Sequence, residues 1–475
     1  MRPRCLVAWF ALLAGFAGCG EGATHPPRGP STEIVVTPRL SRGAEPVADG
    51  AANADPPAVL SSQPDAAPVT SSPAPRPAAA VGHLEGPSRL AHLFEALARL
   101  DDGHAHDDVR ILQYGDSHTA SDLGTAVFRR ALQARFGDGG RGFVSIGKPW
   151  KSYVQDGVHG GMTKEFEPTK VKFHEGGTFS GLDGCYGLLG VGIGATKGGG
   201  RAWTEVAAGA SHIEIDYGQD PRGGSFDVFI DGARAGRIAT RAAQPGSGYF
   251  AFDLADAPHQ VELRTVGDGE VRVFGMALDR PQAGVVVDAL GINGAQILTP
   301  LRWNEEHFTE QLRHRGPELV ILAYGTNESM EPGLSDAEVE RKMVDMLGRV
   351  ARAAPTASCL LLGPVDRASH TKGRDDWKSA PRIPELVAVQ KRVAEAAGCG
   401  FYDQLEAMGG SGSILAWAAE PQPRAGHDRV HLTRSGYAQL GAAFASDLMR
   451  SYDEWRAERG LPPTSAPKTW GVASR

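Results

Sequence analysis

The chain has 475 residues, 41% of them hydrophobic and 7% aromatic, and its formal net charge is −7. This length exceeds one typical domain, so two domains with flanking tails are expected, and the hydrophobic fraction is ordinary for a soluble globular protein with a core. The net negative charge excludes the basic footprint of a nucleic-acid-binding protein and disfavours electrostatic attraction to anionic lipid.

Residues 1–19 are typical of an export signal. Arg2 and Arg4 precede a short apolar run over 6–16, which is too short to span a bilayer. The small residues before Cys19 resemble a bacterial lipobox, so we expect a signal peptide over 1–19 and lipidation of Cys19. Because Gly20 rather than aspartate follows, the resemblance favours an anchor in the outer membrane. The alternative is an ordinary secretory signal, which would give a periplasmic or secreted protein.

Residues 20–84 are rich in proline and alanine and lack apolar periodicity, so they predict a disordered tether. The first part of an α/β domain is expected over 85–150. Within it, apolar spacing predicts a helix over 87–101, a strand over 110–114 and a second helix over 119–136.

Between 151 and 283 the chain is glycine-rich, and short segments of alternating polarity replace the strand-then-helix pattern. Many short strands at this spacing predict an inserted all-β sandwich domain. The clearest predicted strands cover 211–217, 225–231, 248–254, 259–266 and 270–276.

From 284 to 458 the α/β pattern resumes, and 459–475 form a tail. Strands are predicted over 285–290, 319–323, 358–362 and 401–402, and helices over 301–315, 335–353, 383–397 and 432–456. Because strands alternate with helices, the expected fold class is α/β, a three-layer doubly wound parallel sheet with an inserted all-β sandwich. Ligands of such sheets bind beyond the carboxyl ends of the strands.

Three cysteines follow the signal. Cys359 and Cys399 each stand at the start of a predicted strand, and an exported chain can form disulfides, so a bridge and a pair of buried free thiols are both open. Cys185 has no evident partner, and no spacing in the chain resembles a metal site.

Ser117, in Gly115-Asp116-Ser117-His118, stands between a predicted strand and a predicted helix. Free backbone N–H groups and the helix dipole favour negative charge at such a position, which suits a nucleophile whose reaction develops an oxyanion. Taken alone, Ser117 could instead cap the helix, with Asp116 adding charge to its first turn.

His431 is the candidate general base. Asp428 precedes it by three residues, close enough for a carboxylate to orient the imidazole and fix its tautomer. An isolated pair with this spacing is more often a surface loop. Asn327, after the strand at 319–323, can donate an amide N–H to an oxyanion, although asparagine is common in turns.

Backbone N–H groups complete the candidate oxyanion hole. Those of Ser117 and Gly294 are the predicted donors, and Gly291 rivals Gly294 because the register of that loop is open. Neighbouring residues are expected to have structural or substrate-shaping roles, namely His118, Tyr324, Glu328 and Asp366. Three tryptophans could stack on sugar rings, although core packing is commoner for this residue type: Trp203, Trp303 and Trp417.

The order of these motifs resembles the SGNH (GDSL-like) hydrolase superfamily. The chain has GDSH at 115–118, GINGA at 291–295, GTNE at 325–328 and D-x-x-H at 428–431. It looks most like peptidoglycan O-acetylesterases, which carry a carbohydrate-binding-module-like β domain between the first two motifs. The resemblance covers roughly 87–150 and 284–456 and implies an SGNH/flavodoxin-like sheet. It also implies roles for five residues: Ser117 as nucleophile, His431 as base, Asp428 as its orienter, and Gly294 and Asn327 as oxyanion donors.

The resemblance implies removal of O-acetyl groups from a cell-envelope polysaccharide, with peptidoglycan as the expected polymer. Hydrolysis would pass through an acyl-serine and need neither metal nor cofactor. Two alternatives stay open: a polysaccharide O-acetyltransferase using the same residues, and a non-catalytic carbohydrate-binding surface lipoprotein. The expected partners are an acetylated glycan and, through the lipid anchor only, a membrane.

Overall fold

The computed structural model describes residues 82–462, apart from 171, 174–178, 181–182 and 372. The predicted signal peptide, Cys19, nearly all of the predicted tether and most of the predicted tail lie outside the described residues. Within the described part of the chain, no helix is long and apolar enough to cross a membrane.

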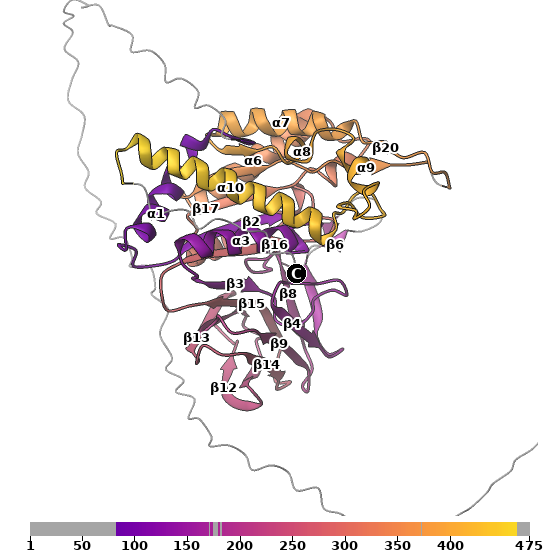
Figure 1. Cartoon of the computed structure of the whole chain (residues 1–475). Coiled ribbons are helices and arrows are strands. Elements are labelled where there is room, and N and C mark those ends of the chain that lie inside the picture. The colour runs from indigo at the N-terminus through magenta and orange to yellow at the C-terminus, as the bar shows by residue number, and fades with distance from the viewer. Residues whose placement is uncertain (1–81, 171, 174–178, 181–182, 372, 463–475) are drawn as a thin grey trace, which may run out of the picture. The chain divides into compact units, whose positions relative to one another are not determined.

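A six-stranded sheet forms the centre of the α/β part (Figure 1). Its order is β16-β2-β17-β18-β21-β1, in which the first five strands are parallel and β1 runs antiparallel to β21. Numbered along the chain, the parallel strands lie in the order 2-1-3-4-5, which is the flavodoxin-like doubly wound arrangement and confirms the predicted fold class. The strands are β1 (Leu84–Glu85), β2 (Val109–Gly115), β16 (Val285–Gly291), β17 (Leu319–Ala323), β18 (Ser358–Leu362) and β21 (Gly400–Tyr402).

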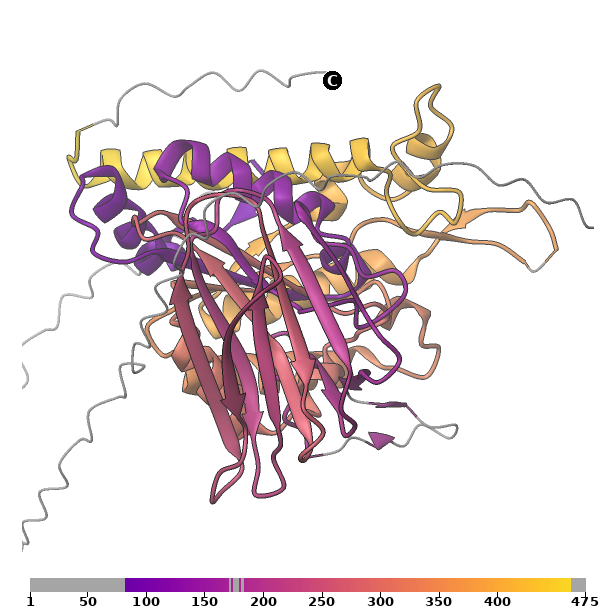
Figure 2. The ribbon, with the colours of Figure 1, turned by 90° about the horizontal axis from the view of Figure 1, so that it is seen from below.

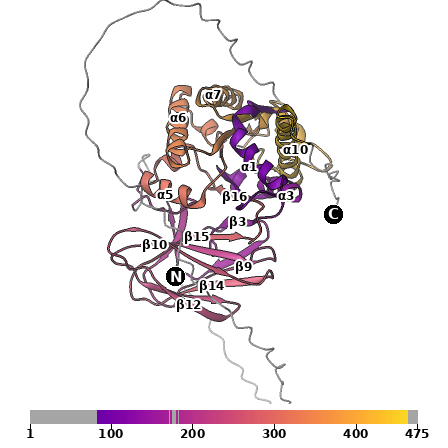
Figure 3. The same cartoon turned by 90° about the vertical axis from the view of Figure 1, so that its left-hand side faces the viewer.

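Helices cover both faces of this sheet, which explains why its strands are almost wholly apolar (Figure 3). On one face pack α1 (Ala91–Asp101), α3 (Leu123–Phe136) and α10 (Arg434–Glu458). On the other pack α5 (Glu305–Arg315), α6 (Asp336–Ala353) and α7 (Arg382–Ala397). After β2 the chain adds β16 on one side and β17 on the other, so the direction of winding reverses at β2. A ligand site is therefore expected beyond the carboxyl ends of β2 and β17.

Two antiparallel sheets build the predicted β sandwich, whose strands stand in front of the helical layers in Figure 2. Their facing apolar side chains form a separate core. One sheet contains β13 (Gly246–Asp253), β10 (His212–Gln219), β15 (Val271–Asp279), β8 (Val191–Ala195), β5 (Glu167–Lys170) and, beside β15, β3 (Gly140–Val144). The other contains β12 (Ala233–Ala239), β11 (Ser225–Ile230), β14 (His259–Thr265), β9 (Arg201–Val206) and β4 (Val158–Met162).

A buried arginine joins the sandwich to the α/β sheet. Arg315, at the end of α5, donates to Asp279 of β15 at 2.6 and 3.0 Å and to Asp288 of β16 at 2.8 and 3.1 Å. All three side chains are at least nine-tenths buried. One guanidinium therefore holds the last strand of the sandwich and the α/β strand that follows it in the chain.

The predicted helix over 119–136 is broken in the structure. A short helix, α2 (Ser117–Ala120), is separated from α3 by Asp122, whose φ is 52°. The Asp122 carboxylate is fully buried and accepts hydrogen bonds from Arg129 and Arg141, so long-range contacts hold this residue in a left-handed conformation.

Strand pairing differs from the expected segments in two places. β3 falls within 85–150, which was expected to belong to the α/β domain, yet it pairs with β15 of the sandwich. Leu84, expected in the tether, pairs with Tyr402 as part of β1 and is fully buried. Neither pairing can be recognised from local sequence, because both partners are distant in the chain.

Side-chain caps decide where several helices begin. Ser335 and Glu338 form a capping box at the start of α6, and Asn304 and Thr433 cap α5 and α10. The predicted helix over 301–315 therefore begins only at Glu305. The remaining short elements are η1 (Pro87–Leu90), β6 (Lys172–Phe173), β7 (Phe179–Ser180), α4 (Leu298–Leu301), η2 (Glu328–Met330), β19 (Ala368–Ser369), β20 (Lys378–Ser379), α8 (Gln404–Met408) and α9 (Ser413–Ala418).

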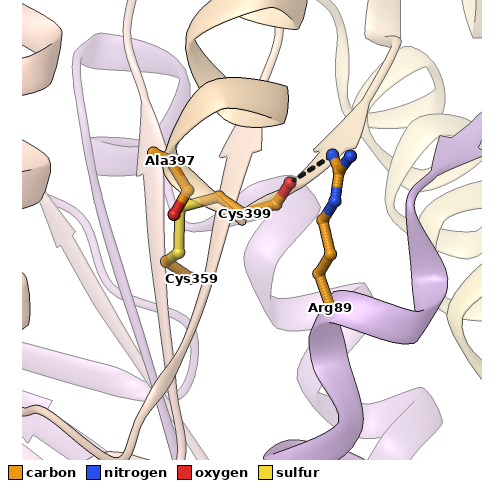
Figure 4. Close-up of a disulfide and its surroundings, with 4 residues drawn as sticks. All are labelled: Arg89, Cys359, Ala397 and Cys399. Atoms are coloured by element: carbon orange, nitrogen blue, oxygen red, sulfur yellow. Dashed lines mark hydrogen bonds between the residues drawn. A yellow bond between two sulfur atoms is a disulfide. The ribbon is translucent and has the colours of Figure 1, made fainter. Parts of the chain in front are cut away.

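The structure decides between the two states left open for the cysteines. Cys359 and Cys399 form a disulfide with their Cα atoms 4.8 Å apart, which joins β18 to the start of β21 (Figure 4). Arg89 donates a hydrogen bond to the carbonyl oxygen of Cys399 at 3.1 Å. Cys185 is a half-buried free thiol, and burial raises its pKa to about 11.

Candidate active site

Ser117 stands directly after β2, at the first position of α2. Asp116 is the residue that caps this short helix, because its carboxylate accepts the N–H of His118 at 2.9 Å. The alternative reading of Ser117 as a cap is therefore wrong. The hydroxyl of Ser117 points instead to His431, whose Nε2 lies 2.8 Å from Oγ.

Asp428 holds His431 through three contacts. Its Oδ2 lies 2.7 Å from Nδ1 of His431, and its Oδ1 accepts the backbone N–H groups of Val430 and His431 at 3.0 Å each. Partial burial acts to raise the pKa of Asp428, but these hydrogen bonds outweigh it and hold the pKa below its usual value. The carboxylate accepts from Nδ1–H, which leaves Nε2 free to accept the hydroxyl proton of Ser117.

Two loops beside Ser117 carry the candidate oxyanion donors. Asn327 follows β17, and its Nδ2 donates to the carbonyl oxygen of Ala295 at 2.8 Å, which leaves its second amide hydrogen available. Gly294 is exposed in the loop after β16, and its N–H has no acceptor among the described residues. The N–H of Ser117 likewise has no acceptor in the described part of the chain.

Gly291 has a different role from Gly294. It is the last residue of β16, and a Cβ atom there would lie 2.1 Å from the backbone nitrogen of Ala120. The absence of a side chain therefore lets α2 pack against the end of β16. A Cβ atom at Gly294 would meet nothing within 4 Å, so packing does not explain that glycine.

His118 contacts Tyr437 next to the candidate base His431, and the sequence pattern does not predict this contact. His118 Nδ1 and the Tyr437 hydroxyl are 2.9 Å apart, and the ring centroids of His118 and His431 are 5.3 Å apart. Burial lowers the pKa of His118, which keeps this imidazole neutral beside His431. Tyr437 lies in the first turn of α10, and no local pattern distinguishes it from a core residue.

The other residues expected to have structural roles are buried. Tyr324 is 3% exposed, and Asp366 is fully buried and accepts the N–H groups of Gly412 and Ile414. Trp303 and Trp417 are 5% and 4% exposed, so they pack in the interior and cannot stack on a sugar. Trp203, on β9, is half-buried and lies over Gly161.

The assembled groups have the chemistry of an acyl-transfer site. A hydroxyl lies beside an imidazole, a carboxylate orients that imidazole, and an amide with nearby free N–H groups can receive an oxyanion. Within the described residues, no cluster of three or more His, Cys, Asp or Glu side chains could hold a metal ion.

The comparisons with known proteins agree with this chemistry. Residues 248–439 match the model of the GDSL-like lipase/acylhydrolase family. The matched segment includes Asn327, Asp428 and His431, and it begins after Ser117. A solved structure of a peptidoglycan O-acetylesterase has a TM-score of 0.64 at 24% identity, over 78% of this chain and 100% of that chain. The fold is therefore shared with a carboxylic ester hydrolase, and residues 248–439 are similar to GDSL-like acylhydrolases. The family match covers residues 248–439, and the likeness to the solved esterase shows the fold of the described chain.

Other solved structures are more distant. A family two carbohydrate esterase from Clostridium thermocellum in complex with cellohexaose has a TM-score of 0.24 at 10% identity, over 57% of this chain and 95% of that chain. One from Cellvibrio japonicus has a TM-score of 0.25 at 12% identity, over 62% and 98%. Scores this low carry no argument about this chain. No curated protein sequence matches it.

Proposed function

We propose that this hydrolase removes O-acetyl groups from a cell-envelope polysaccharide, with Ser117 as nucleophile, His431 as general base and Asp428 as its orienting carboxylate. The observation that carries the proposal is the continuous hydrogen-bonded chain from Ser117 Oγ to His431 Nε2, and from His431 Nδ1 to Asp428 Oδ2, at 2.8 and 2.7 Å. Folding alone does not require this hydrogen-bonded chain, which joins Ser117 to a histidine 314 residues further along the sequence.

In the first step His431 takes the proton of Ser117 while Oγ attacks the ester carbonyl. The tetrahedral oxyanion is stabilised by the N–H groups of Ser117 and Gly294 and by the amide of Asn327. When the intermediate collapses, the sugar oxygen leaves with the proton from His431, and acetyl stays on Ser117. Water, deprotonated by His431, then attacks the acetyl-serine, which releases acetate and returns the proton to Ser117.

The choice of an acetylated envelope glycan rests on likeness. The solved structure with the same fold is a peptidoglycan O-acetylesterase, and the β sandwich lies between the first and second motifs of this chain, as expected for that group. Gly294, rather than Gly291, is proposed as the backbone donor because its N–H is unbonded among the described residues, whereas Gly291 is enclosed by α2.

We also propose that the protein is exported and anchored to the outer membrane through a lipid on Cys19. The disulfide between Cys359 and Cys399 supports export, because such bonds persist in oxidising compartments. Labelling cells with a fatty-acid analogue would test this proposal. Incorporation should occur in the native chain and be lost in Cys19→Ala, and an unlabelled native chain would favour an ordinary secretory signal.

The catalytic proposal is tested with 4-nitrophenyl acetate and with O-acetylated peptidoglycan fragments analysed by mass spectrometry. The native protein should hydrolyse both, and Ser117→Ala should lose on the order of 10³-fold or more in kcat. Ser335→Ala, which removes a hydroxyl from the cap of α6, is the matched control and should stay within twofold. Equal rates for Ser117→Ala and the native protein would refute the nucleophile, whereas acetyl appearing on an oligosaccharide acceptor would favour a transferase.

A further inference from the structure

Glu328 is a fully enclosed carboxylate between the two loops that carry Gly294 and Asn327. It is 1% exposed, and its two oxygens accept from different loops. Oε1 accepts the N–H of Ile297 at 2.6 Å, and Oε2 accepts the N–H of Gly325 at 3.0 Å. Ile297 is three residues beyond Gly294, and Gly325 is two residues before Asn327.

We infer that Glu328 is a positioning residue that sets the distance between the two halves of the oxyanion hole. This inference rests on the proposed function. A single side chain that accepts one N–H from each loop ties the loops together, and the bond from Asn327 Nδ2 to the carbonyl oxygen of Ala295 crosses the same gap at 2.8 Å. The bonds of Asn327 to Ala295 and of Glu328 to Ile297 both cross to the loop of Gly294, so a shift of one loop is transmitted to the other.

The side-chain type is dictated by this geometry. Two N–H groups on opposite sides require an acceptor at each end of the side chain, and a carboxylate has one on each oxygen, whereas glutamine has an acceptor at one end and a donor at the other. Gly325 has a φ of 130°, and a Cβ atom there would lie 2.8 Å from Cγ of Pro364, so the loop cannot easily move to compensate.

Keeping a carboxylate at this place has a cost for the fold. Burial raises the pKa of Glu328 to about 7, and the nearby Asp116 adds to the shift, so the ionised form is disfavoured where it lies. A group that is unfavourable for stability and linked by backbone bonds to both oxyanion loops is what a site held for chemistry is expected to contain.

The test compares Glu328→Gln with Glu331→Gln. Glu331 is exposed and accepts a hydrogen bond from Gln296 across the same two loops at 3.2 Å, so its variant is a matched control that leaves both backbone N–H groups bonded. With 4-nitrophenyl acetate, Glu328→Gln should lower kcat about ten- to a hundredfold with KM within twofold, since a displacement of about 1 Å costs up to about 10²-fold. Glu331→Gln should stay within twofold in both.

A second readout isolates the oxyanion hole. Phenylboronic acid forms a tetrahedral adduct with an active-site serine, so its inhibition constant should rise by the same factor as kcat falls in Glu328→Gln. A purely structural role would lower the active fraction without changing that constant. Glu328→Asp, whose shorter carboxylate cannot reach both N–H groups, should behave similarly and serves if Glu328→Gln does not fold.

The two proposals fail in different ways. If the native protein has no esterase activity that depends on Ser117, the proposed function is wrong. If the native protein is active and Glu328→Gln keeps its kcat and boronate inhibition constant, only the positioning role of Glu328 is overturned.

Discussion

Replacing Asp428 with asparagine should change the tautomer of His431, so that the ring proton moves from Nδ1 to Nε2. Oδ1 of Asp428 accepts two backbone N–H groups at 3.0 Å, so the single oxygen of an asparagine must take that position. The NH₂ group of the asparagine then faces Nδ1 of His431. In the native protein the carboxylate accepts a hydrogen bond from this nitrogen at 2.7 Å. Nδ1 must become an acceptor, the proton moves to Nε2, and Nε2 can no longer take the proton of Ser117.

The size of the effect follows from exposure. In a buried triad the equivalent change costs about 10⁴-fold in kcat. The side chains of His431 and Asp428 are 45% and 51% exposed, so water can relieve part of the mismatch. We therefore expect a loss of about 10³-fold in kcat/KM for Asp428→Asn, which corresponds to about 4 kcal/mol of transition-state stabilisation.

Asp428→Ala separates the tautomer effect from simple loss of the carboxylate. Alanine places no donor against Nδ1, so either tautomer stays accessible and the loss should be at least tenfold smaller than for Asp428→Asn. Both variants are compared by kcat/KM on 4-nitrophenyl acetate at pH 8, with thermal unfolding to check that each is folded. Asp428→Asn retaining more than a tenth of native kcat/KM, or being more active than Asp428→Ala, would refute the reasoning.

Further predictions concern stability. Arg315→Met leaves two buried carboxylates without their cation and should cost about 3–5 kcal/mol in urea unfolding, and a loss below about 1 kcal/mol would contradict the clamp. Reducing the bond between Cys359 and Cys399 should cost about 2–4 kcal/mol, measured with and without reductant, and a Cys359→Ala/Cys399→Ala protein should be insensitive to reductant.

Burial also raises the pKa of Asp108 from 3.8 to about 7, so the folded state holds this proton more tightly than the unfolded state; the stability it contributes is full below about pH 4 and is lost as pH rises through 7. Asp108→Asn should reduce the change in unfolding free energy between pH 5 and 8. An unchanged dependence of that free energy on pH would contradict the raised pKa of Asp108.

Much of the architecture follows from local patterns. Apolar runs separated by amphipathic helices require parallel strands covered on both faces, and parallel strands end at one edge of the sheet. That rule alone placed Ser117 and Asn327 at the same edge, because each follows a buried strand. The caps at Ser335 and Thr433 are local as well, so helix starts near them could be predicted to within a few residues.

Other features depend on partners far away in the chain. The break at Asp122 exists because Arg141, outside the helix, reaches its carboxylate, and the pairing of β3 with β15 joins segments more than a hundred residues apart. No periodicity records such contacts, since each partner alone is compatible with several conformations. The same is true of Glu328, whose role is visible only when Ile297 and Gly325 are seen on its two sides.

By itself, then, the sequence determined which chemical groups are present and at which edge of the sheet they stand, since alternating apolar strands and amphipathic helices require parallel strands that end at one edge. Only the tertiary structure decided that Ser117 Oγ and His431 Nε2 are 2.8 Å apart, that Cys359 is bonded to Cys399, and that Gly291 is packed while Gly294 is open. The physical reason is that hydrogen-bond and packing geometry is set to fractions of an ångström by the whole set of long-range contacts, whereas periodicity specifies position only to about one turn or one strand residue.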